Sequence, residues 1–309
     1  MLRQAGQNKI ATPDIARLAL VMFLWATCFP LIAAGLVTSP PLTFAALRSF
    51  VAGAGLLLPA LALRRPQPQG LRSWLMLIAI GFTITSLGFG GMFLAGGLVS
   101  PGLATVLANV QPLLAALLAF FILGERLGPR HQIGLSLGFV GILLVALPGF
   151  GAGEGRSPLL GIGYILLGAI GVALGNVLLK RSAGQVDLLT TTGWQFTLGG
   201  IPLLALAAWV EAPQQITWTA AFIAILLVLS LLGTAASFAL WFSLLHRNEL
   251  NRLNTFTFLT PVFALIMGAL FFNERLQWVQ VAGIGLILIG VLSASQGTAQ
   301  GPKLDGRNA

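Results

Sequence analysis

The sequence predicts an all-α polytopic membrane protein in which ten transmembrane helices form two inverted five-helix repeats. Three observations lead to this prediction: the amino-acid composition, the spacing of the charged residues and an internal sequence repeat. Of the 309 residues, 57% are hydrophobic and only 8% are charged, and the mean hydropathy is +0.92. Because about 25% of the residues of a soluble globular protein are charged, most of this surface is expected to face lipid.

Stretches without charge set the number of spans. Residues 73–124 contain no Lys, Arg, Asp or Glu, and the shorter stretches 157–179, 188–210, 253–273 and 276–302 contain none either. About 20 helical residues cross a hydrocarbon core, so each shorter stretch holds one span and the longest holds two. Together with turn signals that contain Pro and Gly, this pattern predicts helices at 18–36, 41–63, 73–98, 102–122, 130–148, 158–180, 188–210, 219–245, 253–272 and 276–296.

The segments outside the helices divide the chain into two halves. The first predicted helix follows three basic residues, like a signal peptide, but no small-residue cleavage site ends it. We therefore expect it to remain as a first span that also directs insertion. The most polar internal linker, 149–157, separates one five-helix repeat within residues 1–148 from a second within 158–296, and residues 297–309 form a cytoplasmic tail.

The positive charges predict the orientation. Cytoplasmic loops of membrane proteins carry an excess of Lys and Arg, and an even number of spans puts both termini on one side. If that side is the cytoplasm, 14 of the 17 Lys and Arg residues face it. Arg156 and Arg275 then face outwards, and Arg48 lies inside the second span. We expect both termini to be cytoplasmic.

An internal repeat is the most informative feature of the sequence. A shift of 149 residues matches a Pro, the triplet Glu-Arg-Leu and two Gly in register: Pro112 with Pro261, 125–127 with 274–276, Gly134 with Gly283 and Gly141 with Gly290. A shift of 147 residues extends the match weakly upstream, with Thr43 on Thr190 and Gly53 on Gly200. Because each copy holds an odd number of spans, the second copy is threaded upside down. Inverted repeats of this kind are typical of secondary transporters.

The composition also excludes several classes of protein. The formal charge of +9 does not indicate a nucleic-acid partner, because Lys and Arg stand singly between apolar blocks instead of clustering on one face. The single cysteine, Cys28, excludes an intrachain disulfide, and no Cys/His cluster has the spacing of a zinc site. No convergent set of His and carboxylates indicates an enzyme. We expect no catalytic residues, no metal and no other cofactor.

Acidic residues are absent from the centres of the predicted spans. All eight carboxylates lie at span ends, in loops or in tails: Asp14, Glu125, Glu154, Asp187, Glu211, Glu249, Glu274 and Asp305. An exporter of cationic drugs that is driven by protons would need a carboxylate at membrane depth that either a proton or the drug can neutralise. This pattern argues against such an antiporter, although a span-end acid such as Asp187 can still reach a vestibule.

Arg48 is the one charge well inside a predicted span. In one interpretation it pairs with a carboxylate or phosphate of an anionic or zwitterionic substrate. In the other it extends to the outer interface or binds the carbonyls of a neighbouring helix end. The sequence gives the two interpretations equal weight.

Other polar and aromatic residues at membrane depth are candidates for substrate binding. Inside a bilayer such groups face the bundle interior or a water-filled cavity, although packing and interhelical hydrogen bonds are their commoner uses. Trp25 and Trp241, together with Trp194, lie inside spans and can stack on an apolar group. The remaining candidates are Thr85, Asn109, Gln111, Asn176, Gln195 and Ser237.

These features together resemble the drug/metabolite transporter superfamily, and within it the EamA-domain family of bacterial inner-membrane exporters. The resemblance rests on the ten spans, Trp25, Arg48 and the pattern of Pro, Glu-Arg-Leu and two Gly that occurs twice, and it covers about residues 15–296. It implies ten helices around a central cavity and the transport of amino acids or other small metabolites, mostly outward. The four-span relatives carry a glutamate in their first span; this chain has Trp25-Ala26-Thr27-Cys28 there, so their proton-coupled mechanism is not carried over.

The sequence thus predicts a transporter in the bacterial inner membrane that exports a small metabolite, with amino acids as the best guess, by alternating access. The expected partners are a small-molecule substrate and the lipid bilayer; a monomer suffices and a homodimer is compatible. Transport of nucleotide sugars or other anionic metabolites is the alternative, as is a channel or scramblase. Substrate, direction of flux and ion coupling are left open.

Overall fold

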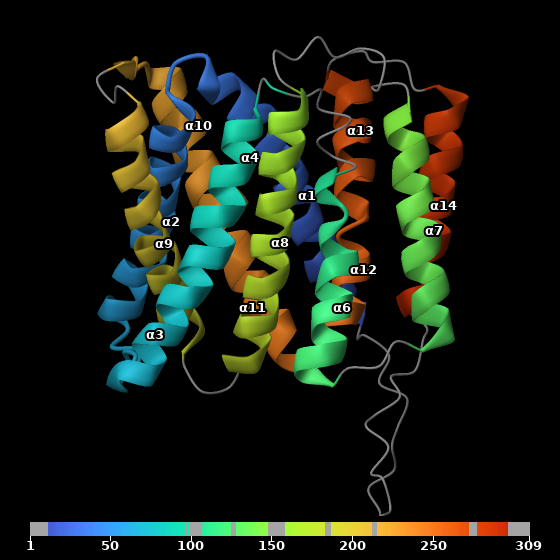
Figure 1. Cartoon of the computed structure of the whole chain (residues 1–309), viewed down its shortest axis with the longest axis horizontal. Helices are drawn as coiled ribbons and strands as arrows, with labels where there is room; N and C mark the ends of the chain where they lie inside the picture. The colour runs from blue at the N-terminus through green and yellow to red at the C-terminus, as the bar shows by residue number, and fades with distance from the viewer. Residues whose placement is uncertain are drawn as a thin grey trace, which may run out of the picture.

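The structure is a computed structural model that describes residues 12–96, 98, 107–124, 128–147, 158–182, 187–211, 215–271 and 277–295. Within these ranges the regular elements are helices, and most of them run side by side between two loop-bearing ends (Figure 1). The predicted all-α membrane fold is confirmed. The linker 149–157, the tail 297–309 and both Glu-Arg-Leu triplets lie outside the described residues.

Most of the described helices begin and end close to the residues predicted for the spans. They are α1 (Thr12–Leu36), α2 (Pro41–Ala62), α3 (Gly70–Ile80), η1 (Gly81–Phe89), α4 (Gly90–Ala95), α6 (Gln111–Leu123), α7 (Pro129–Ala146), α8 (Pro158–Ser182), α9 (Leu188–Val210), α10 (Ala220–Ser230), η4 (Leu231–Ala236), α11 (Ser237–Arg247), α12 (Leu250–Phe256), α13 (Leu259–Phe271) and α14 (Trp278–Ser295). Six continuous helices among the described residues are long and apolar enough to cross a membrane. The count of ten spans stays a prediction.

Two of the long helices contain π-helical segments that the sequence did not predict. In the predicted span 73–98, α3 continues through η1 into α4, and in the predicted span 219–245, α10 continues through η4 into α11. A π-helical turn widens the helix and shifts the direction of the side chains that follow it, and such turns are frequent at functional sites. Both segments lie in the interior part of their helices, beside buried polar residues.

The predicted span 253–272 is two helices instead of one. A turn at Thr257 and Phe258 separates α12 from α13. Pro261 has no N–H to bond the carbonyl of Thr257, and its ring disfavours a continuous helix through that residue. Pro112 likewise lies in the first turn of α6, where proline is tolerated, and not in the middle of a helix as predicted.

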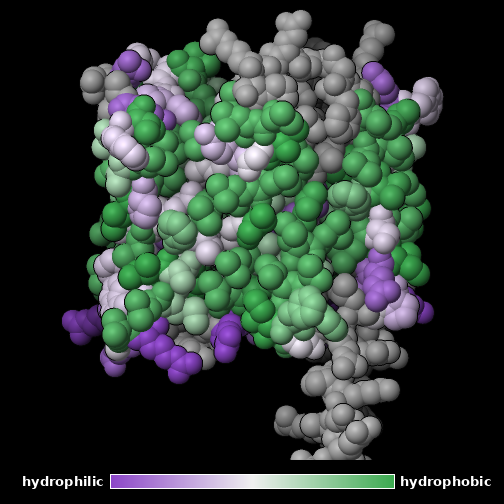
Figure 2. Space-filling view, in the orientation of Figure 1, coloured by the Kyte–Doolittle hydropathy of each residue, from purple (hydrophilic) through white to green (hydrophobic). Residues whose placement is uncertain are grey.

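The distribution of polarity is that of a membrane protein. Figure 2 shows hydrophobic residues covering the middle of the visible face and hydrophilic residues gathered towards its two ends. Large apolar side chains such as Leu58, Phe121 and Ile201 are exposed. Polar side chains are instead buried in the bundle, among them Arg48, Thr85, Gln195, Thr234 and Ser237. Since a polar group exposed to lipid is costly, this arrangement is stable only in a bilayer or an equivalent solvent.

Close glycine contacts join α7 to α14. A Cβ atom added at Gly141 would lie 2.6 Å from the carbonyl oxygen of Gly283, and one at Gly290 would lie 2.7 Å from that of Gly134. These distances are too short for any side chain, so glycine is what lets the two backbones approach. The two helices lie together at one side of the bundle, on the right in Figure 1.

Candidate functional site

The helices α2 and α9 carry two of the predicted site residues and are tied together at both ends. At one end, Glu211 follows α9 and its carboxylate accepts hydrogen bonds from the first turn of α2. The donors are the backbone N–H of Leu42 (2.7 Å), the backbone N–H of Thr43 (2.8 Å) and the hydroxyl of Thr43 (2.8 Å). The start of α2 therefore lies at the end of α9, and the two helices are antiparallel.

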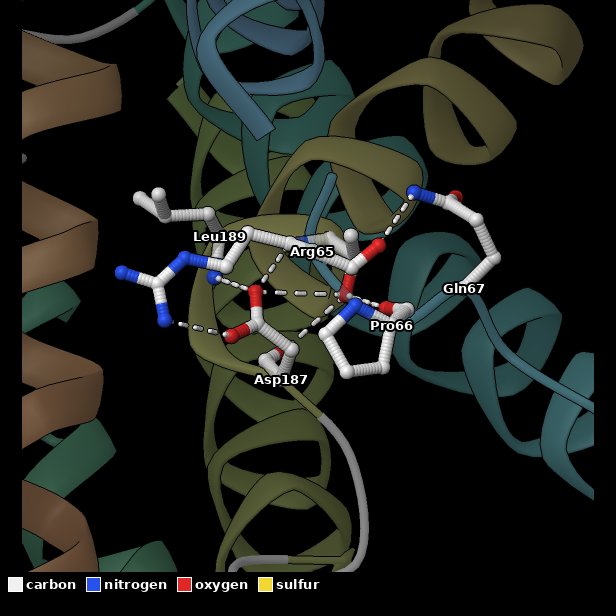
Figure 3. A network of polar contacts seen from close by, with 6 residues as sticks. Arg65, Pro66, Gln67, Asp187 and Leu189 are labelled. Atoms are coloured by element: carbon white, nitrogen blue, oxygen red, sulfur yellow. Dashed lines mark hydrogen bonds and ion pairs between the residues drawn. The ribbon is translucent and has the colours of Figure 1, made fainter. Parts of the chain in front are cut away.

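The opposite end of the pair is held by Asp187 (Figure 3). This carboxylate caps the N-terminus of α9 by accepting from the backbone N–H of Leu189 at 3.0 Å, and it lies 3.8 Å from the guanidinium of Arg65 beyond α2. The hydroxyl of Thr190 also donates to the carbonyl of Pro66 at 3.1 Å. Asp187 is thus a capping residue between two helix ends. Contacts at both ends therefore fix α2 against α9 and position Arg48 and Gln195 between those ends.

Arg48 lies two turns into α2 with 4% of its surface exposed. Its Nε donates to the hydroxyl of Thr234 in η4 at 2.7 Å, and one terminal nitrogen is 3.6 Å from the sulfur of Cys28. The guanidinium carbon is 4.3 Å from the ring centroid of Phe89. No carboxylate of the described residues is within salt-bridge distance of it. The cation is therefore held inside the bundle by neutral partners and an aromatic face.

Four of the predicted residues form two hydrogen-bonded pairs whose indole rings lie against each other. The indole N–H of Trp25 in α1 donates to the hydroxyl of Ser237 at 3.1 Å, and that of Trp241 donates to the side-chain oxygen of Asn176 at 3.1 Å. The two indole rings are 5.3 Å apart between centroids. The structure thus brings residues from α1, α8 and α11 together. Trp194 does not join them, since its N–H donates to the side chain of Gln67.

A cluster of phenylalanine rings connects this group to Arg48. Phe238 is 5.4 Å from the Trp25 ring and 5.1 Å from the Phe196 ring. Phe196 in turn stacks on Phe89 at 5.9 Å, and Phe89 lies beneath Arg48. We name Phe89, Phe196 and Phe238 the ring cluster. Sequence reasoning missed these rings, because phenylalanine is common in every span and carries no polar signal at membrane depth.

Gln195 and Thr85 are predicted residues whose side-chain polar atoms all lack hydrogen-bond partners among the described residues. Both are 0% exposed, and neither the two amide atoms of Gln195 nor the hydroxyl of Thr85 has a hydrogen-bond partner in the described part of the chain. A buried polar atom without a partner costs about 1–3 kcal/mol. Unsatisfied groups of this kind call for a functional explanation.

Asn109 and Gln111 lie at the start of another helix, α6. Gln111 begins α6, which packs against α8 and α12, and its buried Nε2 atom has no hydrogen-bond partner among the described residues. Asn109 lies in the turn before α6 and has an interaction partner. Both residues are close to Pro112 in the sequence.

Lys180, at the cytoplasmic end of α8 in the predicted topology, does not point to an anion site. Its ammonium group donates to the carbonyl of Leu245 at 2.6 Å and to that of Asn248. These carbonyls belong to the end of α11, where a cation also interacts favourably with the helix dipole. The contact stabilises the helix end.

Apolar spans around a polar and aromatic interior define a polytopic membrane protein built like a transporter. A sequence model of the EamA-like transporter family matches residues 15–147 and again 159–296. The chain therefore belongs to the EamA-like transporter family, within the drug/metabolite transporters, and is a multi-pass membrane transporter.

Similar proteins agree with this assignment. An uncharacterized transporter of Bacillus subtilis, YvbV, is 31% identical over 275 residues, which are 89% of this chain and 88% of that protein. A probable amino-acid metabolite efflux pump of Escherichia coli is 27% identical, over 88% of this chain and 91% of the pump. A solved crystal structure shares the fold, with a TM-score of 0.75 and 20% identity over 92% of this chain and 96% of the other.

Proposed function

We propose that this transporter exports a small zwitterionic or neutral metabolite, with amino acids as the leading substrate class, from the cytoplasm across the bacterial inner membrane. The observation that carries the proposal is Arg48, a buried cation without a carboxylate within salt-bridge distance among the described residues. A buried charge is costly unless it is paired and hydrogen-bonded. A substrate carboxylate would supply the missing charge, with paired hydrogen bonds to the guanidinium.

The remaining site residues suit the rest of such a substrate. The indole faces of Trp25 and Trp241 offer an apolar surface, and the side-chain amides of Asn109, Gln111 and Gln195 offer hydrogen bonds. Among the described residues no carboxylate is within salt-bridge distance of Arg48. The ammonium group of an amino acid would instead meet the aromatic rings nearby, which attract cations through their π faces. The similarity to a probable amino-acid metabolite efflux pump of Escherichia coli supports the same substrate class.

We further propose that the two halves are inverted repeats that exchange inward-open and outward-open packings around one central site. The glycine contacts of α7 and α14 support this. The 149-residue shift carries Gly134 to Gly283 and Gly141 to Gly290, and it therefore exchanges the two contacts Gly141–Gly283 and Gly134–Gly290. The family model also matches the chain twice. One monomer holds both halves, and both termini would lie in the cytoplasm.

The test is counterflow in proteoliposomes loaded with unlabelled amino acids and given a trace of labelled ones. Protein-dependent transient accumulation is expected from a carrier, whereas a channel or scramblase gives none. Arg48→Ala should reduce this counterflow at least ten-fold, because truncating one partner of a buried charged pair costs about 2–5 kcal/mol. Arg17→Ala is the matched control, since Arg17 is exposed and paired with Asp14, and it should transport normally.

Two outcomes would contradict the proposal. Flat traces across the amino-acid panel, from folded protein, would exclude amino acids as the substrates of uncoupled exchange. Wild-type rates in Arg48→Ala would remove Arg48 from the binding site. Anionic metabolites such as nucleotide sugars are the weaker alternative, because Lys180 binds a helix end instead of adding to the charge of Arg48.

A further inference from the structure

Arg48 has a counterpart in the second half of the chain. The shift of 147 residues that matches Thr43 with Thr190 and Gly53 with Gly200 also places Arg48 on Gln195. Arg48 lies two turns into α2 and Gln195 two turns into α9. Because the two helices are antiparallel, these residues lie on opposite sides of the middle of the pair. The second half therefore has an uncharged amide where the first half has a cation.

The hydroxyl that binds Arg48 has a counterpart as well. The shift of 149 residues places Thr85 on Thr234 and Phe89 on Phe238. Each threonine lies in a π-helical segment, Thr85 in η1 and Thr234 in η4. The rings of Phe89 and Phe238 lie 6.3 Å apart, so these two counterparts meet inside the bundle. Arg48 and Thr234 thus correspond to Gln195 and Thr85 in the aligned sequence, and both threonines lie in a π-helical segment.

The two pairs differ in one respect. Arg48 and Thr234 are hydrogen-bonded at 2.7 Å, whereas Gln195 and Thr85 are fully buried and have no hydrogen-bond partner among the described residues. The backbones that carry them are in contact. A Cβ added at Gly199, one turn after Gln195, would lie 2.5 Å from the Cβ of Thr85, and one at Gly81 would lie 2.6 Å from the carbonyl oxygen of Gln195. One helix interface therefore presents two unsatisfied neutral groups.

The ring cluster links the two pairs. Phe89 lies under the guanidinium of Arg48 at 4.3 Å and stacks on Phe196 at 5.9 Å. Phe196 is the residue after Gln195 on α9. The ring cluster thus contacts the cation directly and contains the residue that follows Gln195 in the chain. An elongated amphipathic molecule requires polar partners on either side of such an apolar surface.

We propose that Gln195 and Thr85 form a second substrate subsite that binds an uncharged hydrogen-bonding group, while Arg48 and Thr234 bind the carboxylate. This inference rests on the proposed function and deepens it. It assigns the substrate to monocarboxylates that carry a neutral amide or hydroxyl group at the far end, with Phe89, Phe196 and Phe238 against the part in between. A second carboxylate would meet the uncharged amide of Gln195 instead of a cation and is disfavoured.

The test compares glutamine with glutamate, which differ only in whether the far end is an amide or a carboxylate. In the wild-type protein, unlabelled glutamine should inhibit the counterflow of a labelled amino acid at a concentration at least ten-fold lower than glutamate. Gln195→Arg copies the residue of the first half, and it should shift this ratio at least ten-fold towards glutamate. Thr85→Val should weaken competition by glutamine and leave competition by leucine unchanged.

A matched control is available on α9. Thr191 is also 0% exposed, and its hydroxyl also lacks a partner among the described residues. It is one turn before Gln195 on the same helix, yet it lies outside the proposed pair. Thr191→Val should therefore leave the glutamine-to-glutamate ratio at the wild-type value, whereas an effect equal to that of Thr85→Val would overturn the role of Thr85.

The failure of this inference is distinguishable from the failure of the proposed function. The purified proteins are also compared by the change in Tm that glutamine and glutamate each produce, which reports binding without transport. Amino-acid counterflow with an unchanged ratio in folded Gln195→Arg overturns the subsite and leaves the proposed function standing. If amino-acid counterflow is absent, the proposed function fails. In that case a shift of the Tm response from glutamine to glutamate in Gln195→Arg still supports the subsite, and no shift overturns it.

Discussion

The indole N–H groups of Trp25 and Trp241 are both occupied by hydrogen bonds to neighbouring side chains. A bound molecule would therefore meet the ring faces of these residues and not their N–H groups. Arg48 differs, because its Nε is bonded to Thr234, while among the described residues its terminal nitrogens have the sulfur of Cys28, 3.6 Å away, and aromatic rings as neighbours. At the scale of single residues, the arginine is the group with unused capacity for a charged partner.

We expect Trp25 and Ser237 to be energetically coupled. Trp25→Phe removes the donor and Ser237→Ala the acceptor of their 3.1 Å hydrogen bond. A double-mutant cycle on unfolding in detergent should give a coupling of about 0.6 kcal/mol, the average for hydrogen bonds between transmembrane helices. Strictly additive effects of the two substitutions would show that this bond contributes nothing to stability.

Two helix pairs, α2 with α9 and α7 with α14, are held by different means. The first pair is tied at its ends by Glu211 and Asp187. The second relies on glycine, since a Cβ at Gly283 would lie 2.6 Å from the carbonyl oxygen of Gly141. Without a hydrophobic driving force inside lipid, such close packing is a main source of helix association.

Gly283→Ala should destabilise the protein by about 1–3 kcal/mol, because the added methyl group forces two backbones apart. Gly285→Ala on the same helix is the matched control, as nothing lies within 4 Å of a Cβ at that position. This control should leave stability unchanged or raise it by up to about 1 kcal/mol, since alanine favours a helix more than glycine. Scanning fluorimetry of the purified variants measures both, and equal Tm values for the two would contradict the prediction.

The whole molecule has two chemically different ends, which predicts its orientation in the membrane. Arg65 and Asp187 lie at one end of the α2–α9 pair, and Glu211 lies at the other. The basic loops place the end with Arg65 in the cytoplasm. Residues of the connection between α1 and α2 would then face outwards.

Cysteine labelling in spheroplasts measures this orientation. Val37 is 84% exposed and Gln69 is also exposed, whereas the native Cys28 is 6% exposed and should remain unlabelled. An impermeant maleimide should label Val37→Cys in intact spheroplasts and Gln69→Cys only after permeabilisation. The reverse result would invert the topology and the direction assigned to the transport cycle.

Several site residues were predictable from the sequence because polarity at membrane depth is a local property. Trp25, Arg48, Asn176, Ser237 and Trp241 were chosen as polar or amphipathic side chains inside apolar spans, and the structure buries four of them and half-buries Trp25. The ring cluster was not chosen, although the 149-residue shift matches Phe89 with Phe238.

The sequence alone determined the apolar spans and the family of this protein. A chain in lipid must satisfy its backbone hydrogen bonds within each segment, so about 20 apolar residues are enough to predict a helix. Only the tertiary structure decided that Arg48 meets a threonine 186 residues away and that Trp25 meets a serine 212 residues away. In lipid, helices are apolar on every side, so the sequence pattern does not reveal which faces meet. That choice and the π-helical turns depend on how the helices pack.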